Sequence, residues 1–177
     1  MVRSPRKTVE RCAVALGSNL GDRIAFLRFG VARLRRLFDD LAVSGVYESA
    51  PMYETDQPSF LNACCAGYTR LTPLQLLAEL QDAERAAGRS RGGPKYGPRE
   101  LDLDLLLHGD AVLELPDLAL PHPRMRERGF VLGPLAEIVP GWTVPGTGAA
   151  AGRTVRELAE AVDRTDLVRT EQSLVTP

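Results

Sequence analysis

The spacing of apolar residues changes from one segment to the next, and this alternation limits the possible folds more than any other feature. Residues 12–16 form a short apolar run that predicts a buried strand, and a glycine-containing turn follows it. Asp22 can then cap a helix whose apolar residues recur at helical intervals. These residues are Ile24, Leu27, Val31, Leu34 and Phe38. The chain therefore begins with a strand and an amphipathic helix.

The pattern continues with two strands, a second helix and another strand. Strand-like segments cover residues 41–47, 61–71 and 101–107. Thr72, Pro73 and Gln75 give the second helix a cap, a proline at its first position and a capping-box glutamine, and Gly88 ends it. This order predicts an α+β fold with a ferredoxin-like βαββαβ core, in which an antiparallel sheet carries helices on one face.

Two further helices are expected beyond this core. One lies near residues 130–138, and the other follows the capping box of Thr154 and Glu157. A chain of 177 residues is the size of one ordinary domain, and no interdomain linker interrupts it. We therefore expect a single domain over residues 1–177, with a core of about 11–140 and a C-terminal helical extension over 141–177.

The charged residues and cysteines exclude several classes of protein. Lysine and arginine number 22 against 23 acidic residues, so the net charge of −1 gives no global field for nucleic acid or an anionic membrane. Three cysteines cannot form a fully paired disulfide framework, and two histidines leave no zinc-binding spacing. Adjacent Cys64 and Cys65 are interpreted as small core or surface residues. Because no apolar run is long enough to span a membrane, we expect a cytoplasmic protein, and we expect a monomer.

The segment 101–105 reads Leu-Asp-Leu-Asp-Leu, and side chains of a strand alternate between its two faces. Asp102 and Asp104 therefore share one face, although aspartate is a poor strand former and the two charges repel. One interpretation is an exposed strand face without function. The other is a hard-cation site, because two carboxylates on a rigid strand can hold one or two Mg²⁺ ions that take further ligands from phosphates.

The neighbours of this acidic pair favour the metal site. The long connection over residues 88–100 contains four glycines, and residues 121–130 add a histidine and further arginines. The basic residues of the connection are Arg89, Arg91, Lys95 and Arg99. A metal beside guanidinium groups is typical of phosphoryl transfer. A surface salt-bridge network is the alternative to the metal site. The long connections at residues 88–100 and 50–59 could equally be surface insertions that the fold tolerates.

Standard nucleotide and hydrolase motifs are missing. No G-x-x-x-x-G-K-[ST] sequence occurs, so a Walker-type site is excluded. The glycines at 146, 148 and 152 have the wrong spacing for a dinucleotide loop and are interpreted as a flexible connection. Ser18 and Ser49 have no histidine and acid arranged for nucleophilic catalysis.

Five sequence blocks occur in the order found in one known family. They are ALGSNLG at 15–21, DQPSFLN at 56–62, the segment 84–89, YGPRELDLD at 96–104, and PHPRM at 121–125 with RGF at 128–130. Through these blocks the chain resembles the 6-hydroxymethyl-7,8-dihydropterin pyrophosphokinases of folate biosynthesis over about residues 13–140. The resemblance implies that pyrophosphate moves from ATP, the co-substrate, to the hydroxymethyl oxygen of the pterin, with release of AMP. It also implies the ferredoxin-like fold expected above.

The resemblance assigns roles to residues by motif position. Asp102 and Asp104 would bind two Mg²⁺ ions, and Arg89 and Arg99 would contact phosphate, so these four are the expected catalytic residues. The expected ATP-binding residues are Gln81, Glu84, Arg91, Tyr96, His122 and Arg128. The expected pterin-binding residues are Ser49, Ala50, Pro51, Met52, Phe60, Asn62 and Phe130. The two phenylalanines would stack on a planar ring whose edge Asn62 reads, which suits the chemistry of such a ligand.

The chain departs from the family pattern at a few positions, and two other classes of protein are alternatives. Tyr96 replaces a frequent tryptophan, so weaker packing of its loop over the ligands is expected, and Ala50 replaces a frequent proline, so a less rigid segment is expected. Asp117 and Ala119 replace a basic and a hydroxyl residue, so thinner ATP contacts are expected at these two positions. An RNA-binding module would need exposed aromatic residues, whereas only 6% of the residues are aromatic. The second alternative is a catalytically inactive ferredoxin-like binding or assembly module, against which the intact Asp, Arg and His set argues.

Overall fold

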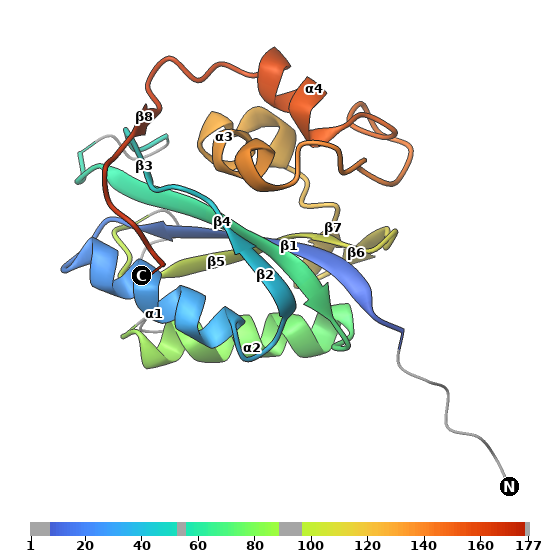
Figure 1. The fold of residues 1–177 in the computed structure, drawn as a ribbon, viewed down its shortest axis with the longest axis horizontal. Helices are drawn as coiled ribbons and strands as arrows, with labels where there is room; N and C mark the ends of the chain where they lie inside the picture. Colours follow the sequence, from blue (N-terminus) through green and yellow to red (C-terminus); the bar gives the residue numbers. More distant parts are fainter. Residues whose placement is uncertain (1–7, 53–55, 89–96, 176–177) are drawn as a thin grey trace, which may run out of the picture.

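The computed structural model describes residues 8–52, 56–88 and 97–175. The first part of the chain forms the elements of the predicted core in the predicted order (Figure 1). They are β1 (Glu10–Ser18), α1 (Arg23–Leu34), β2 (Asp39–Val43), β3 (Tyr47–Ser49), β4 (Phe60–Thr69), α2 (Pro73–Ala86) and β5 (Asp102–His108). Both helices begin as expected, because Asp22 accepts a hydrogen bond from Ala25 N and Thr72 forms a capping box with Gln75.

The segment expected to be one strand over residues 41–47 is divided into β2 and β3. Between them the buried Ser44 bonds to Cys64 twice: its N–H donates to Cys64 O at 2.9 Å, and its Oγ accepts from Cys64 N at 2.9 Å. The next N–H, that of Gly45, turns away to the Glu137 carboxylate at 3.1 Å. The side-chain bonds thus replace part of the ladder and separate the two strands.

The remaining elements are β6 (Leu113–Leu115), β7 (Leu118–Leu120), the short 3-10 helix η1 (Met125–Glu127), α3 (Gly129–Ile138), α4 (Val155–Ala161) and β8 (Val168–Arg169). The two α-helices agree with the sequence prediction, and Thr154 and Glu157 form the expected capping box. The small strands were not predicted. Each has two or three residues, too few for a periodic apolar pattern.

The main sheet is antiparallel in the pairings around β1 and has the order β5-β1-β4-β3-β8, with β2 also paired to β4. Its register brings the predicted site blocks together on β1 and its neighbours. Gly17 of β1 lies opposite Asn62 of β4 and opposite Asp102 of β5, and Ala15 lies opposite Asp104.

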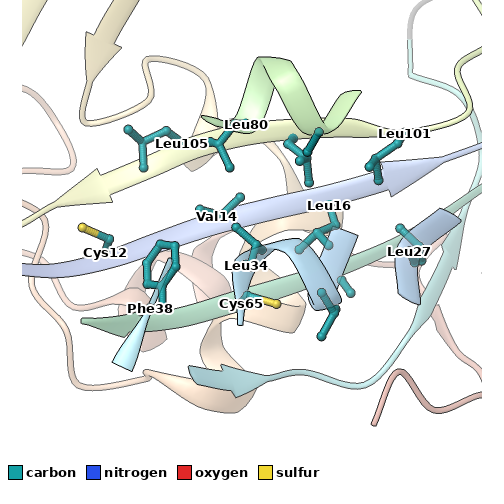
Figure 2. Packing of buried hydrophobic residues seen from close by; sticks show 14 of the residues in the cluster. Cys12, Val14, Leu16, Leu27, Leu34, Phe38, Cys65, Leu80, Leu101 and Leu105 are labelled. Carbon is teal, nitrogen blue, oxygen red and sulfur yellow. The ribbon is translucent and has the colours of Figure 1, made fainter. Parts of the chain in front are cut away.

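Helices cover both faces of the sheet. As Figure 1 shows, α1 and α2 lie against one face, and α3 and α4 of the C-terminal part lie against the other. The first core joins leucines of α1, α2 and β5 to Leu16 of β1, as Figure 2 shows. Cys65 belongs to this core, whereas Cys64 belongs to the second core with α3 and α4. The cysteines are therefore core residues, and α3 and α4 together bury the face that α1 and α2 leave open.

Among the described helices, none combines the length and the apolar character needed to cross a membrane.

Candidate active site

A cavity of about 190 Å³ lies where β1, β4 and β5 meet the start of α3. The sequence-predicted site residues that line it are Ser49, Ala50, Met52, Phe60, Asn62, Arg99, Asp102, Asp104, His122, Arg128 and Phe130. They come from segments far apart in the chain, and the sheet register described above gathers them. The fold therefore places the acidic pair and the aromatic pair around one cavity.

The acidic pair lies on β5 as the alternating pattern predicts. Leu103 and Leu105 are buried in the first core, and Asp102 and Asp104 line the cavity. Each carboxylate has an arginine partner: Arg99 Nη1 donates to Asp102 Oδ1 at 2.7 Å, and Arg128 Nη1 donates to Asp104 Oδ2 at 3.1 Å. His122 Nε2 lies 3.8 Å from the same Asp104 oxygen.

The surroundings of this cluster disfavour the ionised form of Asp104. Burial raises the pKa of Asp104 above its ordinary value, the neighbouring Asp102 raises it further, and His122 and Arg128 oppose the shift. Burial lowers the pKa of His122, although Asp104 opposes that change. The imidazole is therefore favoured in its neutral form. Its Nδ1 accepts a bond from Arg124 N at 3.2 Å, which places the proton on Nε2, facing Asp104.

The donor set of the acidic pair fits a hard divalent cation. Two carboxylates of one rigid strand line the cavity, and each raises the free energy of the other's ionised form. A cation bound between them would relieve this repulsion. Within residues 8–52, 56–88 and 97–175, no group of three or more His, Cys, Asp or Glu side chains could hold a metal ion. The described chain thus offers a pair of carboxylates, and an ion there would need water or ligand oxygens as well. Mg²⁺ is commonly held in this way.

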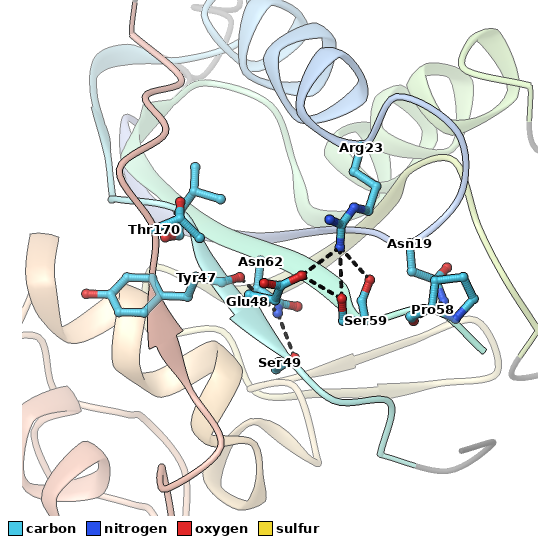
Figure 3. Close-up of polar contacts among 10 residues, drawn as sticks. Asn19, Arg23, Tyr47, Glu48, Ser49, Pro58, Ser59, Asn62 and Thr170 are labelled. Carbon is cyan, nitrogen blue, oxygen red and sulfur yellow. Dashed lines mark hydrogen bonds and ion pairs between the residues drawn. The ribbon is translucent and has the colours of Figure 1, made fainter. Parts of the chain in front are cut away.

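The other half of the cavity is a slot with aromatic and amide groups. Phe60 at the start of β4 and Phe130 in the first turn of α3 both line it. Asn62 is 4% exposed, and its Nδ2 donates to Ser49 Oγ at 2.8 Å and to Tyr47 O at 3.4 Å (Figure 3). These bonds to β3 fix the carboxamide. Its Oδ1 lies 3.8 Å from the place where a Cβ on Gly17 would stand.

A polar cluster beside the slot fixes β3 from the side of α1. Arg23 Nη1 donates to Glu48 Oε1 at 3.0 Å and to Ser59 O at 2.8 Å (Figure 3). Ser59 Oγ donates to the same Glu48 oxygen at 2.6 Å. The bonds from Ser59 and Arg23 lower the pKa of Glu48, so the carboxylate remains ionised. The cluster holds β3 to the residue that precedes Phe60.

Asn19 is a site residue that the sequence reasoning missed. Its side chain is buried, and it joins the two long connections: Nδ2 donates to Gln57 Oε1 at 2.9 Å, and Oδ1 accepts from Arg99 N at 2.8 Å. Gln57 and Gly97, unlike Asn19, line the cavity itself, and neither was predicted. A signal was present, since Asn19 belongs to the ALGSNLG block, but its partners can be recognised only in three dimensions.

Several expected site residues are not among the lining residues of the cavity. Gln81 is exposed on α2, and Glu84 of the same helix is 7% exposed, with its Oε1 accepting from Leu103 N at 2.8 Å. Pro51 lines an adjacent cavity of about 340 Å³, which Phe130 also lines. Arg89, Arg91 and Tyr96 lie outside the described residues. The ATP-binding and pterin-binding roles of these residues remain predictions.

Comparison with known proteins gives matches over most of the chain. A family model described as 7,8-dihydro-6-hydroxymethylpterin-pyrophosphokinase (HPPK) matches residues 13–140. The 2-amino-4-hydroxy-6-hydroxymethyldihydropteridine pyrophosphokinase of Pseudomonas aeruginosa is 42% identical over 155 residues, which cover 86% of this chain and 92% of that protein. The protein of the same name from Bacillus subtilis is 46% identical over 127 residues, or 71% of this chain and 75% of that protein.

Other relatives are much longer than this chain. The folic acid synthesis protein fol1 of Pneumocystis carinii is 44% identical over 140 residues, which cover 78% of this chain but 19% of that protein. Among solved structures, the wild-type HPPK-DHPS of Plasmodium falciparum with pteroate has a TM-score of 0.67 at 14% identity, over 89% of this chain and 43% of that one. At that identity the likeness supports the fold alone.

Proposed function

The chain belongs to the 7,8-dihydro-6-hydroxymethylpterin-pyrophosphokinase family, and from this premise we propose that it transfers pyrophosphate from ATP to the hydroxymethyl oxygen of 6-hydroxymethyl-7,8-dihydropterin, releasing AMP. The observation that carries the proposal is the single cavity that joins an aromatic and amide slot to a pair of carboxylates with arginine partners. A planar ring bound in the slot has its substituent directed along a wall that also bears the charged groups.

The slot recognises the pterin in this proposal. Phe60 and Phe130 supply the stacking faces, and Asn62, held by Ser49, presents its carboxamide oxygen to the hydrogen-bonding edge of the ring. Ala50 and Met52 close the same side. Because Asn62 is already oriented by two bonds to β3, little side-chain entropy is lost when the ring binds.

The charged half binds the phosphates. Asp102 and Asp104 would hold Mg²⁺, two ions in our proposal, and the bound metal would neutralise phosphate charge. Arg99 and Arg128 bring guanidinium groups to the same wall, and guanidinium binds phosphate oxygens in pairs. Neutral His122 adds an N–H donor at Nε2. The residues orient the pterin hydroxyl toward the β-phosphorus and exclude water from it, which is how positioning lowers the barrier.

The roles of Arg89 in catalysis and of Gln81, Glu84, Arg91 and Tyr96 in ATP binding are part of the same proposal. For these five residues the proposal rests on the family pattern alone. We further propose that the protein acts in the cytoplasm and as a monomer. The three cysteines support a reducing compartment, since all are free and buried.

The test is AMP formation from ATP in the presence and absence of 6-hydroxymethyl-7,8-dihydropterin, with and without MgCl₂. We expect AMP only with both pterin and Mg²⁺, in equal amount to the pterin diphosphate. Asp102→Asn should lower kcat by at least about a hundredfold, the scale of losing one group that stabilises transition-state charge. ATP hydrolysis that is independent of the pterin, or no AMP at all, would contradict the proposal.

A further inference from the structure

The segment that follows α4 crosses from one layer of the molecule to the other. We call residues 162–175 the C-terminal strap. It leaves α4, forms β8 beside β3 and ends near α1, as the red trace in Figure 1 shows. It lies wholly outside the family match over residues 13–140. None of the residues expected to bind substrate belongs to it.

The strap packs closely on the first turns of α3, where two glycines make room for it. A Cβ at Gly129 would stand 2.2 Å from Asp163 O, and a Cβ at Gly133 would stand 2.5 Å from Leu167 Cδ2. These glycines are four residues apart and therefore lie on the same side of the helix. Phe130, which lines the slot, is next to the first of them. The strap thus backs the turn of α3 that presents this ring.

The strap also forms the outer edge of the main sheet beside β3. Tyr47 pairs with Arg169 and Glu48 pairs with Val168, and Thr170 N donates to Val46 O at 2.8 Å. Hydrogen-bonded pairs alternate along an antiparallel ladder, so the bond at Thr170 implies a second one from Val168 N to Glu48 O. β3 has only three residues, so its position depends on β4 on one side and on β8 on the other.

Glu137 connects α3, the start of β3 and the strap. Its carboxylate accepts from Gly45 N at 3.1 Å, from Tyr47 Oη at 2.9 Å and from Arg169 Nη2 at 3.2 Å. Further along, Leu174 is buried in the first core, and Arg28 of α1 donates to Ser173 O at 3.0 Å. The strap is therefore anchored at both ends.

The two elements that the strap contacts each contribute to the slot, whose other residues, Phe60 and Asn62, lie on β4. β3 bears Ser49, whose hydroxyl accepts from Asn62, and α3 bears Phe130. The acidic pair lies on β5, at the opposite end of the sheet order from β8. A change in β8 should therefore reach the slot before it reaches the acidic pair.

We propose that the C-terminal strap is a positioning element for the pterin: its β8 ladder and its contact with α3 keep Asn62 and Phe130 at a fixed separation before substrate binds. This inference rests on the proposed function, because it takes the slot to be the pterin site. No strap residue lines the cavity that contains the slot, although residues 162–167 line the adjacent cavity. The strap residues act through Ser49, Asn62 and Phe130.

The test compares Val168→Pro with Val168→Thr. The Val168 side chain is 62% exposed, so the proline variant loses mainly the N–H that donates to β3, whereas threonine keeps it. We expect Val168→Pro to raise KM for the pterin about tenfold, the effect of one lost hydrogen bond, with KM for ATP within about twofold of wild type. Val168→Thr should match wild type.

Arg169→Ala is a milder variant that removes an exposed ion pair with Glu137 and is compatible with folding. We expect a rise of about twofold in the pterin KM, restored by Arg169→Lys. A merely structural role of the strap would lower the melting temperature of Val168→Pro without a selective change in the pterin KM. That result, or an equal rise of both KM values, would overturn the inference.

Calorimetric binding of 6-hydroxymethylpterin to the same proteins separates this inference from the proposed function. If the wild type binds this pterin without forming AMP, and Val168→Pro binds it more weakly, the function fails and the strap inference stands. If AMP forms normally but Val168→Pro binds the pterin as wild type does, the inference fails alone. A wild type that binds no pterin would overturn both.

Discussion

The ionised carboxylate of Asp104, which the proposed metal site requires, lowers the stability of the folded protein. Its pKa is raised because burial and Asp102 both disfavour the charged form more than Arg128 and His122 favour it. A carboxyl group whose pKa is higher in the folded than in the unfolded state stabilises the fold at low pH, and that stability is lost as pH rises through the folded-state pKa. Neutral asparagine at this position has no such dependence.

We therefore expect Asp104→Asn to gain in free energy of unfolding relative to wild type as pH rises from about 3 toward 7. Urea unfolding at several pH values, in buffer with EDTA, measures the difference. Asp110→Asn is the matched control, because the Asp110 side chain is 92% exposed. Turnover of Asp104→Asn, assayed separately in buffer with MgCl₂ and no EDTA, should be lost while wild type remains active. A difference in stability that shrinks with rising pH would contradict the account.

Gly17 limits the width of the slot. A Cβ at this position would meet Phe60 Cδ1 at 3.7 Å and Asn62 Oδ1 at 3.8 Å, which are ordinary contact distances. Gly17→Ala should therefore fold normally but place a methyl group in the cavity. We expect KM for the pterin to rise about tenfold, in line with the usual penalty for overpacking, and KM for ATP to change less than about twofold. Steady-state kinetics with each substrate varied in turn checks this, and an unchanged pterin KM would contradict it.

At the scale of elements, Asn19 in the turn after β1 is hydrogen-bonded to both long loops, residues 50–59 and 88–100. Removal of this side chain breaks its hydrogen bonds with Arg99 N and with Gln57 Oε1. We expect Asn19→Ala to lower the free energy of unfolding by about 1–3 kcal/mol, since two part-buried hydrogen bonds are lost. We also expect kcat to fall, because Arg99 loses one of the bonds that hold it at the cavity wall.

The control for this variant is Asp22→Ala in the same turn. It removes the cap of α1, a bond of 3.1 Å from Ala25 N to Asp22 Oδ1, at a cost of about 1 kcal/mol. Because Asp22 is exposed and caps a helix end, its loss should leave kcat unchanged. Equal kinetic defects in the two variants, measured after correction for the folded fraction, would mean that Asn19 acts through stability alone.

Elements with strong local signals were predicted correctly, and those defined by distant partners were not. The caps of Asp22 and Thr72 and the Leu-Asp alternation of β5 are local patterns, so sequence alone located both helices and the face of the acidic pair. β8 has two residues and exists because β3 lies beside it, more than a hundred residues earlier in the chain. No local pattern can indicate such a strand.

At the scale of the whole molecule, the residue types of the site could be predicted but their grouping could not. Motif blocks indicated Phe60, Asn62 and Asp104, and the sheet register then brought them to one cavity. Glu84 illustrates the limit. The family pattern predicts that it binds ATP, and the structure adds a hydrogen bond from Leu103 N of β5 to its Oε1, a partner that no local pattern indicates. Helical spacing gives the direction of a side chain but not the element that it meets.

The reactivity of the three thiols can show whether the two hydrophobic cores, one on each face of the sheet, open together. Cys12 and Cys65 lie in the first core and Cys64 in the second, and each is at most 1% exposed. Burial raises the pKa of Cys12 and of Cys65 to about 12, and that of Cys64 well above its ordinary value. Because the thiolate is the reactive form, the folded protein should be inert to thiol reagents at neutral pH.

We expect three equivalents of a chromogenic disulfide reagent to react at once in denaturant. In native buffer the three thiols should react in a single slow phase, because we expect both layers to unfold together and to expose all three at once. Opening of one layer alone would expose only the thiols of that layer and would give two phases. Leu74→Cys is the control, since this side chain is 56% exposed on α2 and its thiol should react immediately. If Cys64 reacted faster than Cys12 and Cys65, as judged by mass spectrometry of the labelled peptides, the layer of α3 and α4 would open independently. The slot would then be able to lose the wall formed by Phe130 while the rest of the sheet stays folded.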